Sequence, residues 1–235
     1  MSPISDANEV IINNLHHFKH ITKVLRMDVG SELELFDGLG GKARVRINSF
    51  YKNKIECKVI LKEIVSRSSE IGISAIVPVI KKEAFTIMVQ KLVEIGIDKI
   101  YIYRSELEDQ TVRKKKNFAW DNYAQDIACR ACEQSGNNFL PTCKIQPGLE
   151  KAIENFQGNF QEYNLIYLDP SAEKLIYDFE KKSFAGLVII SGPESGFSEN
   201  EKNILQSKDL MSVSLGNNIL RAETAPIVAA FTLMR

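Results

Sequence analysis

The chain has 235 residues, and its 30 lysines and arginines balance its 30 aspartates and glutamates, so its formal net charge is +0. This balance excludes a strongly basic protein that binds nucleic acid non-specifically, but it leaves room for a local RNA-binding patch. No apolar run approaches the roughly 20 residues of a membrane span. The N-terminus lacks the pattern of a signal peptide, so we expect a cytoplasmic protein that does not enter a membrane.

The cysteines and histidines are the candidate metal ligands of this chain. Cys129 and Cys132 form a C-x-x-C pair inside a helical pattern, with no second pair and no clustered histidine nearby. A zinc or redox site is one interpretation, but we favour buried helix cysteines and expect no metal. His16, His17 and His20 have weak ligand spacing and no acidic partner, so we expect them to cap a helix or to face RNA.

Alternating apolar and polar residues predict three antiparallel strands early in the chain, at residues 32–35, 42–47 and 55–61. Polar and glycine-rich turns separate them, which is typical of a meander that forms a small barrel. The outward face carries Arg44 and Arg46 among several lysines. Such a face is either simply solvated or a surface that contacts RNA phosphates.

A short polar linker at residues 67–72 is expected to end this first domain. An apolar strand at 73–80 and an amphipathic helix at 82–95 follow, and Gly96 stops the helix. The next strand is predicted at 98–103. This strand–helix–strand order implies a parallel pair.

The polar stretch at 105–116 ends in R-K-K-K and is predicted to be an exposed loop. A basic run is usually a solvated face. Beside a ligand-binding edge, however, it would help to guide RNA, which makes Arg113 and Lys114 candidate RNA contacts.

A long helix is predicted at 117–135, stopped by Gly136. Glu133 and Gln134 fall at its C-terminal end, where the helix dipole disfavours an anion. A carboxylate at that point indicates a specific partner, so both residues are included among the candidate RNA contacts.

Three further strands are predicted at 164–168, 187–190 and 211–215, which completes an α/β fold with a mostly parallel sheet. The last two strands run into glycine-containing loops and then into helices. Ser198 and Glu201 form a capping box that starts the first of these helices. The loops should lie at the carboxyl edge of the sheet, where open α/β sheets bind ligands.

Two of these loops carry candidate binding groups. Gly192, Pro193 and Gly196 leave the backbone of the first loop bare, and no Gly-Lys-Ser/Thr pattern provides a phosphate cradle. Arg221 and Glu223 place one cation and one anion in the second loop. Two interpretations stay open at this point: two ordinary capped turns, which we favour for a generic pair of loops, and a pocket that reads an adenosine-like ligand through the backbone.

Two motifs carry a resemblance to a known family: G-P-E-S-G-F-S-x-x-E at 192–201 and L-G-x-x-I-L-R-A-E-T-A at 215–225. They resemble the paired signature of the SPOUT (trefoil-knot) methyltransferases. Within these they are similar to the RsmE family, which methylates N3 of a uridine in small-subunit ribosomal RNA. The segments at 16–30, 90–97 and 131–137 resemble further motifs of that family, in the same order.

The resemblance implies a PUA-like RNA-binding β-barrel over residues 1–68 and a SPOUT domain over residues 73–235 that ends in a trefoil knot. It favours RNA contact by the barrel, to which Arg26 is added, and it places the segment around Glu133 near the active site. This sequence has Asn137 where the family usually has arginine, which is a departure at one expected RNA or substrate contact.

The resemblance also implies S-adenosylmethionine as cofactor, 16S ribosomal RNA in the small subunit as substrate, and a homodimer. The C-terminal helix at 227–234 is a candidate for the dimer interface, with simple core packing as the alternative. The residues implied to bind the cofactor lie in three loops: Leu168, Gly192, Pro193, Glu194, Gly196, Leu215, Gly216, Ile219 and Leu220.

A chemical role follows for two side chains of the last loop. Because a guanidinium stays protonated, Arg221 is hypothesised to hold a uracil oxygen and to stabilise its developing charge. Glu223, or a water that it orients, is the candidate proton acceptor, unless it only positions Arg221. The competing functions are a ribose 2′-O-methyltransferase and a non-catalytic RNA-binding assembly factor. The motif at 131–137 disfavours the first, and the intact loop motifs disfavour the second.

Overall fold

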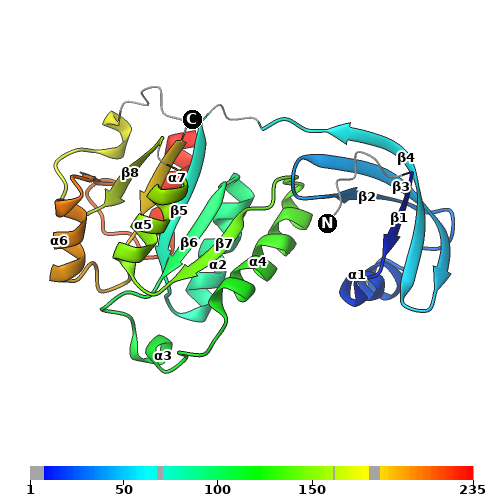
Figure 1. Ribbon diagram of the computed structural model, residues 1–235, viewed down its shortest axis with the longest axis horizontal. Helices are drawn as coiled ribbons and strands as arrows, with labels where there is room; N and C mark the ends of the chain where they lie inside the picture. Colours follow the sequence, from blue (N-terminus) through cyan, green and yellow to red (C-terminus); the bar gives the residue numbers. More distant parts are fainter. Residues whose placement is uncertain (1–7, 68–70, 161, 180–185, 235) are drawn as a thin grey trace. The chain divides into compact units, whose positions relative to one another are not determined.

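A computed structural model describes residues 8–67, 71–160, 162–179 and 186–234 of the chain. The chain divides into two compact units, Met1–Ser68 and Ser69–Arg235, and each unit has its own β-sheet (Figure 1).

The first unit is built on a four-stranded antiparallel sheet with the strand order β1-β4-β3-β2. The three strands predicted from the sequence are confirmed, and a short first strand, which was not predicted, pairs with the last one. A short α-helix and a π-helical turn follow that first strand. The elements are β1 (Glu9–Ile12), α1 (Leu15–Lys19), η2 (His20–Val24), β2 (Glu32–Phe36), β3 (Gly41–Tyr51) and β4 (Lys54–Ile64).

Strand β3 shows why the alternating pattern is a reliable signal here. Ala43, Val45 and Ile47 are at most 1% exposed and point into the core of the unit. Arg44 and Arg46 lie between them and are exposed on the other face. A sheet with one buried and one solvated face requires this period of two.

The second unit contains a six-stranded sheet with the order β10-β8-β9-β5-β6-β7, and every neighbouring pair in it is parallel. The strands are β5 (Gly72–Pro78), β6 (Lys99–Tyr103), β7 (Thr142–Gln146), β8 (Tyr163–Leu168), β9 (Gly186–Ile190) and β10 (Met211–Val213). The helices are α2 (Lys82–Ile95), α3 (Gln110–Arg113), α4 (Trp120–Ser135), α5 (Leu149–Asn159), the 3₁₀ turn η3 (Ile176–Asp178), α6 (Glu199–Ser207) and α7 (Thr224–Met234).

Helices form a layer on each face of this sheet (Figure 1). Helix α2 packs against α4 and α7, and α7 also contacts β5 and β9. Helix α5 contacts β6, β7 and α6. Because both faces are covered, the central strands need apolar residues throughout, and all five residues of β9 are buried.

The α/β prediction is confirmed in its main elements, including the helix stops. Gly96 and Gly136 adopt left-handed conformations with φ of 104° and 71° after α2 and α4. Strand β7 and helices α3 and α5 were not predicted. The knot stays an implication of the resemblance, since residues 180–185 lie outside the described part of the chain. None of the helices in the described ranges is long and apolar enough to cross a membrane.

Candidate active site

The strand order brings three loops to one place. Strands β10, β8 and β9 are neighbours and parallel, with Val213 in register with Leu168 and Tyr167 in register with Ile190. The loops that follow these strands therefore leave the same carboxyl edge side by side. This edge is where parallel sheets place their ligands.

The loop after β9 approaches this edge with little side-chain bulk. Gly196 has a φ of +75°, and its N–H donates to the carbonyl of Pro193 at 2.9 Å, which closes a tight turn. A Cβ on Gly192 would lie 3.4 Å from the ring of Phe197. Glu194 is exposed at the tip, whereas Pro193 is buried.

The base of this loop is anchored in the core. The hydroxyl of Tyr103, at the end of β6, donates to the carbonyl of Ser191 at 2.9 Å, and the N–H of Ser191 donates to the carbonyl of Ile76 at 3.0 Å. Burial, and then the charge of Glu201, raises the pKa of the Tyr103 hydroxyl well above its ordinary value. Tyr103 therefore stays neutral and keeps its proton for this hydrogen bond.

A second set of contacts joins the end of this loop to the segment that follows β6. The buried carboxylate of Glu201 accepts from the N–H of Ser198 at 2.9 Å and from the N–H of Glu106 at 3.2 Å. The hydroxyl of Ser105 donates to the same carboxylate at 3.2 Å, and that of Ser195 donates to the carbonyl of Leu107 at 2.8 Å. The capping box predicted from the sequence is confirmed, and it also holds a neighbouring loop.

Glu106 completes this connection. Its carboxylate accepts from the hydroxyl of Ser198 and from the amide of Asn200, both at 2.6 Å. These two hydrogen bonds, led by that of Ser198, hold the pKa of the Glu106 carboxyl below its usual range. Glu106 was not predicted from the sequence, because nothing in a polar stretch marks which carboxylate will meet a residue 92 positions further on.

The loop after β8 is tied to the start of the loop after β10. The N–H of Asp169 donates to the carbonyl of Val213 at 3.0 Å. Ser214 donates to the carbonyl of Lys174 at 2.8 Å and accepts from the N–H of Ile176 at 2.9 Å. The two loops therefore form one connected rim.

The loop after β10 offers free backbone groups to a ligand. Gly216 has a φ of +121°, and a Cβ there would meet nothing within 4 Å. Within the described residues, the main-chain groups of 217–220 form no hydrogen bond. Ile219 is 84% exposed at the tip. This loop can thus read the polar edge of a flat ligand through N–H and C=O groups.

Arg221 and Glu223 lie at the end of this loop, immediately before α7. The Arg221 side chain is 87% exposed and that of Glu223 is 14% exposed, with 4.0 Å between Nη1 and Oε1. The carbonyl of Arg221 accepts from the N–H groups of Thr224 and Ala225 at 2.9 and 3.0 Å, which fixes its backbone. A weak, solvated ion pair leaves the guanidinium able to reach a substrate.

The candidate RNA contacts of the first unit lie on a mixed surface. Arg26 is exposed, with a φ of 51°. Arg46 pairs with Glu32 at 2.7 Å, and Arg44 stands opposite Glu34 in the β2–β3 register. Acidic neighbours therefore offset part of the positive charge on this face.

The candidates of the second unit fall at two different edges. Arg113 and Lys114 are exposed at the end of α3. Glu133 and Gln134 are exposed at the end of α4, which leads into the amino end of β7. Within one chain, these two residues are thus at the edge opposite the three loops, and the structure does not bring them near Arg221.

Asn137 has a local structural role. Its amide donates to the carbonyl of Val93 at 3.0 Å, and its side-chain oxygen accepts from the N–H of Phe139 at 2.9 Å. Asn137 therefore joins the end of α2 to the turn after α4.

The cysteines are free thiols, and the C-x-x-C pair lies on α4. Burial raises the pKa of Cys132 to about 12, so this thiol is protonated at neutral pH. Across the described residues, no group of three or more His, Cys, Asp or Glu side chains is arranged to hold a metal ion.

Comparison with known proteins identifies the two units. The RNA methyltransferase domain family matches residues 66–234, and the RNA methyltransferase PUA domain family matches residues 12–60. A curated relative, ribosomal RNA small subunit methyltransferase E of Rickettsia conorii, is 29% identical over 97% of this chain and 90% of its own length. The protein of the same name from Bacillus subtilis is 27% identical over 89% and 84%.

Solved structures give the same result. A Legionella pneumophila methyltransferase in complex with its bound cofactor SAM has a TM-score of 0.84 and 27% identity, and covers 96% of this chain and 90% of its own. The small subunit methyltransferase E of Neisseria gonorrhoeae, bound to S-adenosyl methionine, has a TM-score of 0.80 and 26% identity, with coverage of 94% and 89%. These matches confirm the resemblance to RsmE drawn from the motifs, and the chain belongs to the family of RNA methyltransferases whose methyltransferase domain follows a PUA domain.

Proposed function

We propose that this protein transfers a methyl group from S-adenosylmethionine to N3 of a uridine in 16S ribosomal RNA of the small subunit. The observation that carries the proposal is that the loops after β8, β9 and β10 meet at one edge of the sheet, with Arg221 and Glu223 at the end of the last loop. The family supplies RNA as the substrate class, and its cofactor-bound members support the choice of cofactor.

The residues of the three loops fit such a cofactor. The unpaired backbone groups of 217–220 suit the adenine edge, and Gly216 lets this loop turn with a φ of +121°, which a residue with a Cβ rarely adopts. Leu168, Leu215, Ile219 and Leu220 supply apolar surface, and Gly192, Pro193 and Gly196 let the opposite loop approach. Glu194, exposed at the tip of that loop, is placed to favour a cationic ligand.

When bound, S-adenosylmethionine supplies an electrophilic methyl group on a sulfonium. Uridine N3 must lose its proton for the methylated product to be neutral. Arg221 holds a uracil oxygen and stabilises the negative charge that develops there as N3 loses this proton. Glu223, or a water that it orients, accepts the proton. The exposure of the Arg221 side chain and the partial burial of Glu223 suit a group that reaches substrate and a group that is held in place.

The direct test is transfer of labelled methyl from S-adenosylmethionine to small ribosomal subunits from cells that lack this activity, followed by nucleoside analysis. Label in 3-methyluridine is the expected result. Label on a ribose would support a methyltransferase activity but refute N3 of uridine as the methylated atom. If the protein binds the cofactor but transfers no methyl group to naked RNA or to assembled subunits, the proposed substrate is refuted. If it shows no cofactor binding and no transfer, the remaining function is that of a non-catalytic RNA-binding factor.

We further propose that the protein is a cytoplasmic homodimer in which α7 contributes to the interface. Pro226, Ala229, Ala230 and Leu233 are buried on one side of α7, while Phe231 is 49% exposed on another. Ile87, on the neighbouring α2, is 48% exposed. A second copy would remove these side chains from water, at about 25 cal/mol for each Å² of apolar surface. Sedimentation at micromolar concentration that shows only monomer would contradict this proposal.

A further inference from the structure

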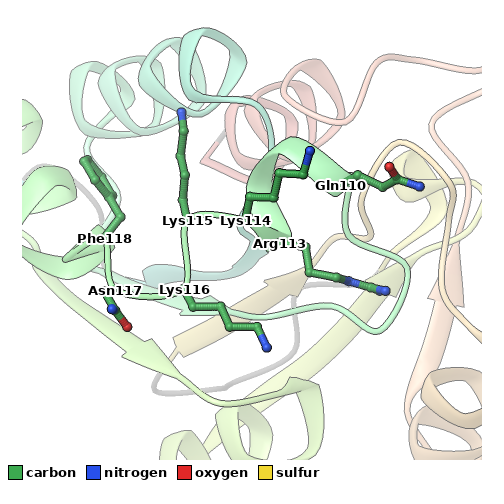
Figure 2. Close-up of a pocket in the computed structure, with 7 residues that line it drawn as sticks. All are labelled: Gln110, Arg113, Lys114, Lys115, Lys116, Asn117 and Phe118. Carbon is green, nitrogen blue, oxygen red and sulfur yellow. The ribbon is translucent and has the colours of Figure 1, made fainter.

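The segment between α3 and α4 surrounds an open hollow of about 760 Å³. Gln110 and the six residues 113–118 line it, and Figure 2 shows their side chains spread around the loop. We call these seven residues the basic hollow, because four consecutive members, 113–116, are cations. Residues 113–117 are all exposed.

The positive charge of the basic hollow is not compensated locally. Elsewhere on the second unit, lysines of helices pair with nearby glutamates, as Lys91 does with Glu94 at 2.8 Å and Lys151 with Glu154 at 3.1 Å. The ammonium groups of 114–116 form no ion pair with any residue that the structure describes. In a chain of net charge +0, the hollow is thus a concentrated positive site.

The first end of the hollow is held in place by α3 and its neighbours. Asp109 caps α3 by accepting from the N–H of Thr111 at 2.8 Å, and it lies 3.6 Å from the ammonium of Lys81. The guanidinium of Arg113 donates to the carbonyl of Glu106 at 2.9 Å. This hydrogen bond fixes the position of the Arg113 side chain, and the other N–H groups of the guanidinium can still bind a ligand.

The other end is fixed by aromatic packing. The ring of Phe118 lies 4.8 Å from that of Trp120 and 5.4 Å from that of Tyr123. The ammonium of Lys82 lies over the Phe118 ring at 5.2 Å. These contacts hold Phe118 in place. The cations at 114–116 therefore lie on a short loop that is fixed at both ends. Such pre-organisation lowers the entropy cost of binding.

The hollow is connected to the carboxyl edge of the sheet. The chain leaves that edge after Tyr103 and is hydrogen-bonded through Ser105 and Glu106 to the start of α6. The start of α6 directly follows the loop that contains Gly192 and Gly196. One set of contacts therefore fixes the hollow relative to the proposed cofactor loop.

We propose that the basic hollow binds the phosphodiester backbone of the substrate RNA and so orients the RNA toward the three loops. The proposal rests on the proposed function and deepens it. Lysine ammoniums act on phosphates as point charges and carry no base specificity, which suits a positioning site. The outward face of β3 is less suited, because Glu32 neutralises Arg46 there.

The test compares the full-length protein with a triple variant, Lys114→Gln, Lys115→Gln and Lys116→Gln. The probe is a labelled fragment of small-subunit ribosomal RNA, and its dissociation constant is measured over a range of salt concentrations. We expect the constant to rise at least tenfold at low salt. The slope of log affinity against log salt should fall by about 2, since each contact to a single strand contributes about 0.7.

A matched control removes three lysines elsewhere on the same unit: Lys91→Gln, Lys144→Gln and Lys151→Gln. The net charge change is identical, and all three side chains are exposed. A second control, Lys114→Arg, Lys115→Arg and Lys116→Arg, keeps the positive charge and should retain binding. An unchanged salt slope in the triple glutamine variant, or an equal loss in the first control, would overturn the proposal.

Calorimetric binding of S-adenosylmethionine separates this proposal from the proposed function. The glutamine variant should bind the cofactor as the native protein does, which also shows that it is folded. A native protein that methylates RNA, with no effect of the triple substitution, would refute the hollow alone. A native protein that binds neither the fragment nor assembled small subunits would refute both.

Discussion

The carboxylate of Glu106 accepts a hydrogen bond of 2.6 Å from the hydroxyl of Ser198, which lies 92 positions further along the chain. Asn200 donates a second bond to the same carboxylate, and Arg113 donates to the carbonyl oxygen of Glu106. One residue therefore connects the loop proposed to hold the cofactor with the hollow proposed to hold RNA. Precise relative placement of the two ligands is what a methyl transfer requires.

The substitution Glu106→Gln should reveal this connection through pH. Hydrogen bonds from Ser198 and Asn200 lower the pKa of Glu106 from 4.5, so its contribution to stability is fully present above that value. The contribution is lost as pH falls through the lower pKa of the folded protein. We expect the difference in unfolding free energy between native and variant protein to be present at neutral pH and to shrink below about pH 4.5. Urea unfolding at several pH values measures it, and Glu173→Gln, at an exposed position, is the control.

The substitution Glu201→Ala should be far more damaging than Glu199→Ala, two residues earlier in the same helical turn. Glu201 is 2% exposed and accepts from Ser198, Ser105 and Glu106, so its loss leaves buried donors without partners. We expect a loss of about 3 kcal/mol. Glu199, 88% exposed, should cost less than about 1 kcal/mol. Chemical unfolding at neutral pH gives both values, and equal losses would show that the buried bonds are not important.

Arg221→Ala tests the proposed stabilisation of charge on the uracil. The side chain is 87% exposed, so we expect a change in stability within about 0.5 kcal/mol. Loss of a donor that acts on developing charge should lower kcat by about 10²–10³-fold, with cofactor affinity retained. Single-turnover methylation and calorimetry measure the two effects. A variant that binds cofactor normally and methylates at the native rate would remove Arg221 from the mechanism.

Glu223→Gln distinguishes a proton acceptor from a group that only positions Arg221. An amide can still hydrogen-bond to the guanidinium but cannot take up the N3 proton. We expect kcat to fall by about 10²–10⁴-fold, the usual contribution of a general base. The pH–rate profile should also change shape. If the variant keeps its rate and its profile across neutral pH, the proton acceptor is another group.

The sequence predicted those parts of the fold whose signals are local. The alternation of Ala43, Val45 and Ile47 with exposed arginines marks a strand on its own, and Ser198 with Glu201 marks a helix start. Strand β7 was missed because its five residues, Thr142–Gln146, show only a weak alternation at the edge of the sheet.

The site depends on information that is not local. That Leu168, Ile190 and Val213 end neighbouring strands follows from the order β10-β8-β9, which no hydrophobic pattern encodes. Several carboxylates lie in the same polar stretch, and only the hydrogen bonds to Ser198 and Asn200, far along the chain, distinguish Glu106 from the others. Asn137 shows the converse: at a motif position where the family usually has arginine, its amide donates to the carbonyl of Val93 and supports a turn.

Gly216→Ala separates backbone geometry from side-chain contact, because nothing would touch the added methyl group. A Cβ at Gly216 meets no atom within 4 Å, but its φ of +121° is one that residues with a Cβ rarely adopt. We expect a loss of about 1–3 kcal/mol in stability, or a rearranged loop with weaker cofactor binding. Gly158→Ala is the matched control: its Cβ also meets nothing, and it lies within α5, where alanine should add about 0.4–1 kcal/mol. Thermal unfolding and cofactor titration of both variants measure these effects. If Gly216→Ala were as harmless as Gly158→Ala in both measurements, the left-handed turn would not be what shapes the loop for its ligand.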